Sequence, residues 1–355
     1  MNKLVLAPIL ILLLSLSSTN CKKNAGDQSS ALDPSTRLQI FQATKQENLK
    51  PTIWDTGDTT ITNEDRLDLF QSHVADLGGG YIGVGSTQNF SLAAWAKTEY
   101  MWLMDFTRVV VWANRVNIAF LKNAKTPAEF RELWDKKSEQ KVYTILDKEY
   151  SNDPELNDYK KAWKISNPFQ RQRFRIDDKI HAKRNTQLWL YSQPTYDHIR
   201  ELAVQGKMIA VKGDLRGPTT VLSIAETARK MQIPIRVIYY SNAEEYFDLA
   251  DDFRRNWLAV PVDEKSKIVR TISVHRNKFP WAEDSDFSTD RGFHYAIQPA
   301  LNFQAWLKKA KPGLRTFKIL QRGETSPEGF TMMNSLPLPE DIQETVSAEA
   351  NSSQK

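Results

Sequence analysis

The stretch Gly80-Tyr-Ile-Gly-Val-Gly-Ser-Thr-Gln-Asn89 carries the strongest fold signal in the sequence. Its apolar beginning is typical of a short buried strand, and Gly83 and Gly85 stand where such a strand turns into a helix. Glycines at this corner let the backbone turn sharply and come close to a ligand. The helix expected next, over residues 90–98, presents free backbone amides at its N-terminus, where negative or polar groups bind.

A second expected strand, residues 100–105, ends in Asp105, which comes 20 residues after Gly85. An acid at the end of the second strand hydrogen-bonds the two hydroxyls of a ribose. Gln88 and Asn89, at the start of the helix, are further candidates for hydrogen bonds to a ligand. The glycines also have a purely structural interpretation, in which they only let the strand–helix corner pack. Both interpretations stay open at this point.

Strands and helices continue to alternate along the chain, which predicts a parallel sheet. The expected helices are residues 35–46, 63–77 (with Asn63 as N-cap), 109–122, 219–231, 243–258 and 298–309. The further expected strands are residues 207–212, 235–240, 267–274 and 316–320. We therefore predict an α/β fold with a mostly parallel sheet of about six or seven strands and helices on both faces.

The chain divides into segments of different character. Residues 1–20 are predicted to be a signal peptide, residues 21–34 a disordered polar tether and residues 336–355 a flexible tail. Between them, residues 35–335 form the predicted α/β domain. Residues 126–205 interrupt the alternation and are predicted to be a helical insertion, which begins with Thr126 as N-cap and Pro127 in the first turn.

Polar side chains follow two further expected strands. Asp214 comes after residues 207–212, while Ser241, Asn242 and Glu245 come after residues 235–240. Because ligands of open parallel sheets bind at the carboxyl edge, Asp214, Ser241 and Asn242 are candidate ligand-binding residues. In an enzyme, Asp214 or Glu245 would be the candidate acid or base. The alternative is that Asp214 begins a turn and that Asn242 caps the helix 243–258, and for Asn242 the cap is favoured.

The chain resembles the class I S-adenosylmethionine-dependent methyltransferase fold and, more closely, a family of bacterial predicted lipoproteins, of the kind found in spirochaetes, with this Rossmann-like architecture. The residues that carry the resemblance are Gly80-Tyr-Ile-Gly-Val-Gly-Ser-Thr-Gln-Asn89, Met104-Asp105, Gly213-Asp214-Leu215 and Tyr240-Ser-Asn-Ala-Glu-Glu-Tyr246. It covers residues 63–320, and the insertion matches least. The resemblance implies an S-adenosylmethionine-like ligand but no established reaction. Where the methyltransferase pattern has an acid and a small residue, this chain has Tyr81 and Thr87.

The N-terminus predicts export and lipid anchoring. Lys3 precedes an apolar run of about 11 residues, which is too short to span a bilayer and is typical of a secretory signal. Cys21, the only cysteine, follows directly and has no disulfide partner. This arrangement resembles a bacterial lipoprotein signal, in which the cysteine carries the lipid, palmitate included. The sequence therefore predicts a lipoprotein at the periplasmic or cell-surface face of a membrane, and a secreted protein with a free thiol is the alternative.

Composition excludes several classes. The net charge of +5 at pH 7 is mild for 355 residues and no long block of like charge occurs, so nucleic acid is not an expected partner. The five histidines are scattered without metal-ligand spacing, so no metal site is predicted. Residues 164–184 carry seven Lys or Arg against two Asp. Such a segment meets lipid headgroups, glycans or an acidic partner, although a solvated helix face is the favoured interpretation.

Three functional hypotheses follow. The first is a lipid-anchored protein with a methyltransferase-like fold that binds a small ligand or a protein partner without established catalysis. The second is an enzyme, an S-adenosylmethionine-dependent or other transferase, that uses the same cleft. The third is a surface adhesin-type lipoprotein in which the cleft is vestigial. Export disfavours the second, because S-adenosylmethionine is made in the cytoplasm.

Overall fold

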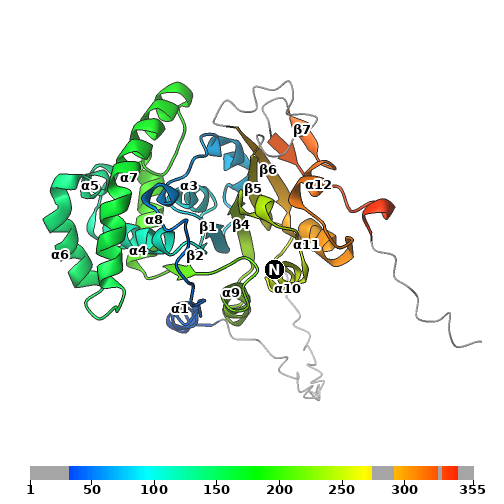
Figure 1. The fold of residues 1–355 in the computed structure, drawn as a ribbon, viewed down its shortest axis with the longest axis horizontal. Coiled ribbons are helices and arrows are strands. Elements are labelled where there is room, and N and C mark those ends of the chain that lie inside the picture. Colours follow the sequence, from blue (N-terminus) through cyan, green and yellow to red (C-terminus); the bar gives the residue numbers. More distant parts are fainter. Residues whose placement is uncertain (1–31, 274–291, 327–329, 343–355) are drawn as a thin grey trace, which may run out of the picture. The chain divides into compact units, whose positions relative to one another are not determined.

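The glycine-rich stretch forms an inner strand of a mixed sheet, as its apolar residues predict. We describe the sheet from a computed structural model, which covers residues 32–273, 292–326 and 330–342. Within these residues the strands are β1 (Gly80–Val84), β2 (Tyr100–Asp105), β3 (Met208–Lys212), β4 (Ile235–Ser241), β5 (Lys267–Ser273), β6 (Phe293–Pro299), β7 (Glu324–Ser326) and β8 (Phe330–Met332). They lie side by side in the order β3-β2-β1-β4-β5-β6-β8-β7 (Figure 1).

The direction of the strands confirms the predicted α/β class. Strands β1 to β5 are parallel, with β2 and β3 on one side of β1 and β4 and β5 on the other. Strand β6 is antiparallel to β5, β8 is parallel to β6, and β7 is antiparallel to β8. The chain order thus reverses between β1 and β4. In open sheets this topological switch point is where the carboxyl ends of the strands leave a crevice.

Helices cover both faces of the sheet, so the inner strands are buried on both sides. On one face a first core includes Tyr81 and Leu103 together with side chains of α3 (Gln88–Trp95) and α4 (Arg108–Asn123). On the other face a second core includes Ile82 and Trp102, because successive strand side chains point to opposite sides. The helices of this second face are α1 (Pro34–Gln42), α9 (Thr220–Lys230), α10 (Asp251–Ala259), α11 (Ala300–Lys309) and α12 (Thr316–Leu320).

The residues expected to form a helical insertion, 126–205, are indeed largely helical. They contain α5 (Pro127–Leu133), α6 (Glu139–Glu149), α7 (Leu156–Arg184) and α8 (Gln193–Val204). These helices lie beside α4 at one side of the view, while β7 lies at the other side (Figure 1). Trp134 and Trp163 are buried in the first core, so the insertion enlarges that core and does not build a separate one.

Two expected elements after β4 are wrong. The strand expected over residues 316–320 is helix α12, which packs the adjacent side chains of Ile319 and Leu320 into the same core, whereas neighbouring strand side chains diverge. The helix expected over residues 243–258 is broken into η4 (Ala243–Tyr246) and α10. Between them the N–H of Leu249 donates to the carbonyl of Leu314 at 2.8 Å, a tertiary contact that overrides the helical pattern.

The helix expected over residues 63–77 is also wrong in its first half. Helical structure begins only at η2 (Leu67–Phe70) and continues in α2 (Gln71–Val74), so Asn63 is not an N-cap. The backbone N–H groups of Asp65 and Arg66 donate instead to the hydroxyl of Tyr295, at 3.1 and 3.0 Å. This distant partner satisfies them without a helix. Residues 60–66, which we call the edge segment, are therefore free to cross the end of the sheet.

A fully buried ion pair joins β5 to η4 on the second face. Arg270 Nε lies 3.0 Å from Glu244 Oε2, and both side chains are 0% exposed. Burial raises the pKa of Glu244 to about 7, although the charge of Arg270 opposes the shift. The guanidinium also lies over the ring of Phe303, 4.6 Å from its centroid. Each charge is thus the ionic partner of the other in a core where Thr316 and Tyr240 are further polar neighbours.

We expect Arg270→Met alone to lower the free energy of unfolding by about 3–5 kcal/mol, because it leaves Glu244 buried without its cation. The double variant Arg270→Met/Glu244→Leu removes both charges and should lie within about 1 kcal/mol of the wild type. Urea denaturation at pH 7.5 measures both. The exposed pair Lys230–Glu226 is the control, since Lys230→Met should cost less than about 1 kcal/mol. A double variant as unstable as the single one contradicts the prediction.

Candidate functional site

The glycine corner and Asp105 meet at the carboxyl ends of β1 and β2. Gly85, with a φ of +90°, donates its N–H to Asp105 Oδ2 at 3.1 Å. Thr107 donates its N–H to Asp105 Oδ1 at 2.7 Å. Burial raises the pKa of Asp105 to about 6, and the hydrogen bonds from Thr107 and Gly85 act in the opposite direction. The carboxylate is thus held by the backbone of both strand–helix connections.

The amides of Gln88 and Asn89 fill the space above this corner. Asn89 accepts a hydrogen bond from the hydroxyl of Tyr81 at 2.8 Å and donates to the carbonyls of Val84 and Ser86 at 2.9 and 2.8 Å. A Cβ on Gly83 would lie 1.8 Å from Asn89 Oδ1, and one on Gly85 would lie 2.4 Å from Gln88 Nε2. The absence of side chains at both glycines is therefore what lets these amides turn inward.

The other predicted residues separate into different environments. Asp214 accepts the N–H of Arg216 at 2.8 Å, in a turn, and its side chain is 41% exposed. Asn242 stands at the N-cap position of the short η4, but its side chain makes no capping hydrogen bond and its amide donates to Glu245 at 3.0 Å. Glu245 in turn accepts the N–H of Ser273 at 2.7 Å. Of this group, only Ser241 faces the polar centre described next.

Glu64, on the edge segment, is the residue that the sequence did not reveal. Its carboxylate is 0% exposed and accepts hydrogen bonds from three hydroxyl groups. Ser241 donates at 2.7 Å, Thr271 at 2.6 Å, and Tyr239 is the third donor. Burial raises the pKa of Glu64, while the three hydroxyls and the charge of Arg173 pull it down. The centre thus joins the ends of β4 and β5, beside the switch point.

A backbone irregularity aims Ser241 at Glu64. The register between β4 and β5 shifts between Tyr239 and Ser241, and Ser241 has a φ of +52°, which is unusual for a residue with a side chain. No feature of the sequence marks this bulge. What the sequence does contain is a set of hydroxyls at the ends of two neighbouring strands, and this is the only signal that could have indicated a buried acceptor there.

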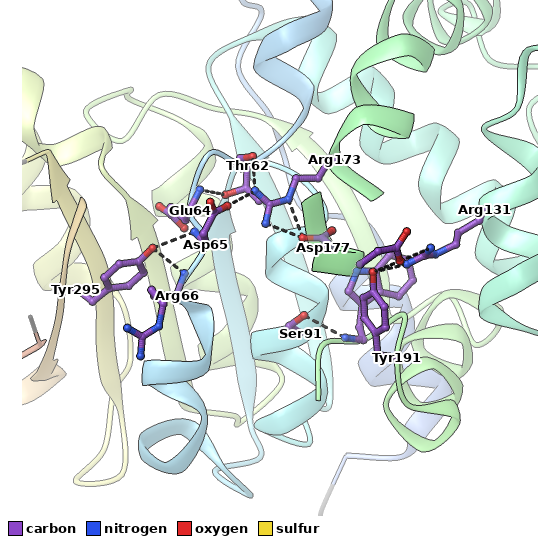
Figure 2. A network of polar contacts seen from close by, with 12 residues as sticks. Thr62, Glu64, Asp65, Arg66, Ser91, Arg131, Arg173, Asp177, Tyr191 and Tyr295 are labelled. Atoms are coloured by element: carbon purple, nitrogen blue, oxygen red, sulfur yellow. Dashed lines mark hydrogen bonds and ion pairs between the residues drawn. The ribbon is translucent and has the colours of Figure 1, made fainter. Parts of the chain in front are cut away.

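Arg173, from the inner side of α7, clamps the edge segment onto the sheet (Figure 2). Its guanidinium donates to the carbonyl of Thr62 at 3.2 Å and to Asp65 at 2.7 Å, and it lies 2.6 Å from Asp177. Gln170 adds a hydrogen bond to the carbonyl of Thr60 at 2.8 Å. Figure 2 shows Tyr295 on the other side of the segment, where it accepts the two N–H groups described above.

These contacts form one polar layer across the carboxyl ends of β2, β1, β4 and β5. Tyr81 connects the glycine corner with the Glu64 centre. Its hydroxyl donates to Asn89 of the corner, and the charge of Glu64, together with burial, raises its pKa. A cavity of about 20 Å³, room for about one water molecule, lies between Thr62 of the edge segment, the start of α3, the inner side of α7 and residues 188–191. Among its lining residues are Thr62, Thr87, Gln88, Ser91, Arg173 and Asp177. The crevice of the switch point is thus filled by the chain itself.

A larger hollow of about 550 Å³ lies elsewhere, between η2–α2 and the β7–β8 pair. Asp68, His73, Glu324 and Phe330 are among the residues that line it, and none of the predicted site residues does. Within the residues that the structure describes, no three His, Cys, Asp or Glu side chains come together in a way that could hold a metal ion. Cys21 and His275 lie outside the described residues.

Fold and site together define a doubly wound α/β protein whose switch-point crevice is filled by its own edge segment. Residues 59–334 match the model of a family described as a domain of unknown function (DUF7790), and the chain belongs to this family. The matched range includes the edge segment, the glycine corner and every strand described above. No curated protein matches the chain. Among the described helices, none combines the length and the apolar character needed to cross a bilayer.

Asp105 predicts a pH dependence of stability. Its pKa is higher in the folded protein, about 6, than its ordinary value of 3.8, so the folded state binds the proton more tightly. This contribution is complete below pH 3.8 and is lost as the pH rises through 6. We expect the wild type to lose about 2–3 kcal/mol more than Asp105→Asn between pH 4 and pH 7.5.

Urea denaturation at several pH values measures this difference. Asp214→Asn changes an acid on the same edge of the sheet whose side chain is 41% exposed, and it is the matched control. Its free energy of unfolding should change with pH as that of the wild type does. Parallel curves for the wild type and Asp105→Asn would show that the carboxyl is not the source of the dependence.

Proposed function

We propose that the chain is an exported, lipid-anchored protein that binds a small polar ligand at the carboxyl edge of its sheet. The observation that supports this proposal is the pair of buried carboxyl groups, Asp105 and Glu64, which lie on either side of β1 and whose pKa values are both raised. Burying carboxyl groups costs free energy. Such groups gather at functional sites, because a ligand gains from polar partners that are already fixed in place.

The ligand class we infer is a compound with vicinal hydroxyls and an adenine-like base, as in S-adenosylmethionine. The oxygens of Asp105 accept hydrogen bonds from the backbone N–H groups of Gly85 and Thr107, and the Thr107 hydroxyl and the Phe106 N–H also bond to this carboxylate. In this proposal two hydroxyl groups of the ligand replace part of these bonds. The residues we assign to binding are Gly83, Gly85, Gln88, Asn89, Asp105 and Ser241. Because the edge segment lies over them, entry of the ligand requires this segment to exchange its hydrogen bonds with Arg173 for contacts to the ligand.

A transferase reaction is the second candidate function. The raised pKa of Glu64 favours it, because a buried carboxyl that holds its proton at higher pH than usual can act as a general acid or base. Asp214 and Glu245, the acids expected from the sequence, have their side chains engaged with Arg216 and Ser273. In this second candidate, Glu64 takes the role that the sequence analysis gave to them.

Calorimetric titration of the mature chain, with Cys21→Ser, tests the binding proposal. We expect S-adenosylmethionine or S-adenosylhomocysteine to bind with a Kd in the micromolar range, about −8 kcal/mol. Asp105→Asn should weaken binding at least about tenfold, since it removes a charged acceptor. Glu226→Gln, an exposed acid on α9, is the control. No heat at millimolar ligand from a folded sample would refute the ligand class, and unchanged binding by Asp105→Asn would refute the site.

Lipid anchoring has its own test, in which the full chain is expressed in a bacterial host supplied with labelled palmitate. We expect the wild type to take up the label and to sediment with membranes, because acyl chains contribute about 0.8 kcal/mol per buried methylene. Cys21→Ser should take up no label and leave the membrane fraction, while Ser18→Ala behaves like the wild type. Equal labelling of the Cys21→Ser chain would contradict the assignment.

A further inference from the structure

Helix α7 carries a row of cations along its outer side, which we call the basic face. Its members are spaced by three, four or seven residues, so they lie on one side of the helix. They are Lys161, Lys164, Arg171, Arg175, Lys179 and Lys183. All are exposed except Arg171, which is partly buried. The opposite side of α7 is buried through residues such as Tyr159, Trp163 and Phe174.

Two of the three acids of α7 pair away from the basic face, and the third, Asp158, is partly buried in the first turn of the helix. Asp177 turns inward to Arg173, and Asp178 pairs with Arg131 of α5 at 2.8 Å. Of the seven cations in residues 164–184, only Arg173 is buried, whereas both acids of this range are paired with arginines. The net positive charge of the exposed side is therefore larger than the count of seven against two indicates. Among the described residues, only Lys164 of the basic face has an acidic partner, Glu139 at 4.0 Å.

The shape of the basic face is that of a long, shallow strip. From Lys161 to Lys183 the helix rises about 33 Å, at about 1.5 Å per residue. The residues between the cations on this side, Pro168, Gln172 and Ala182, are exposed and include no large apolar side chain. In Figure 1 the C-terminal turns of α7 extend past α5 and α6. Lys179 and Lys183, on these turns, are exposed.

A flat array of phosphate groups matches this strip better than a nucleic acid does. Single-stranded nucleic acids need aromatic side chains on which the bases stack. Of the two phenylalanines between the cations of this helix, Phe174 is only 7% exposed and Phe169 is partly buried. A surface of anionic lipids offers closely spaced phosphates without requiring such contacts. It also requires no groove, because the cations meet the headgroups from above.

We propose that the basic face of α7 is a docking surface for the phosphate-bearing headgroups of an anionic lipid bilayer. Docking lays α7 along the membrane, with the edge of the sheet held at a fixed height above it. The inference relies on the proposed lipid anchor only for bringing a membrane within reach. Eleven residues separate Cys21 from Asp33, and such a length spans at most about 40 Å.

Vesicle sedimentation tests the basic face with the mature Cys21→Ser chain, which carries no lipid anchor, and with no small ligand added. Its outcome is therefore independent of the proposed anchor and of the proposed ligand site. The vesicles are phosphatidylcholine alone or phosphatidylcholine with phosphatidylglycerol. We expect binding to the anionic vesicles only, with affinity falling steeply as salt rises. Arg175→Gln/Lys179→Gln/Lys183→Gln should weaken it about 100-fold, roughly fivefold per cation.

The matched control removes three exposed cations near the end of α11, on the other face of the sheet. Lys308→Gln/Lys309→Gln/Lys311→Gln should bind like the wild type. Circular dichroism checks that each variant is folded, which the exposure of the changed residues favours. The proposal is overturned if the basic-face variant binds as well as the wild type, if neutral vesicles bind equally, if no vesicle binds, or if duplex DNA binds the basic face more tightly than anionic vesicles do.

Discussion

The carboxylate of Glu64 is the constraint on which the arrangement of the sheet edge depends. A carboxylate that is 0% exposed needs hydrogen-bond donors on every side, and the strands β4 and β5 supply them as hydroxyls. To reach these donors the edge segment must lie across the ends of the strands. This position in turn leaves Thr62 and Asp65 beside α7, where Arg173 binds them. One buried acid thereby links the sheet to the helical insertion.

The same constraint explains why the crevice of the switch point is filled. In many doubly wound proteins the carboxyl ends of the central strands face a ligand. Here Asn89 enters the space left by Gly83, and Glu64 covers the end of β4. Asn89 and Glu64 thus place their own polar atoms where the polar atoms of a ligand lie in such proteins. The chain therefore fills the volume of this crevice with polar side chains of its own.

The sequence predicts elements well where local signals decide the structure. The apolar runs of β1 to β5 and the glycines after β1 are such signals, and the Gly85–Asp105 contact follows from them, because parallel strands end together. The edge segment, η4 and α12 were missed because their backbone groups or side chains respond to distant partners, such as Tyr295 and Leu314. The Glu64 centre joins residues up to 207 positions apart, a separation that no periodic pattern records.

Lys and Arg are distributed differently on the buried side and the exposed side of α7. Arg173 is 2% exposed and serves two carboxylates and a carbonyl at once, which requires the planar fork of a guanidinium. A lysine there would present one point charge to three acceptors. On the outer side four of the six cations are lysines, whose strongly hydrated ammonium groups suit a wet surface. The spacing of the outer cations comes from the helix itself, and the inner arginine joins that helix to the edge segment that carries the buried acid.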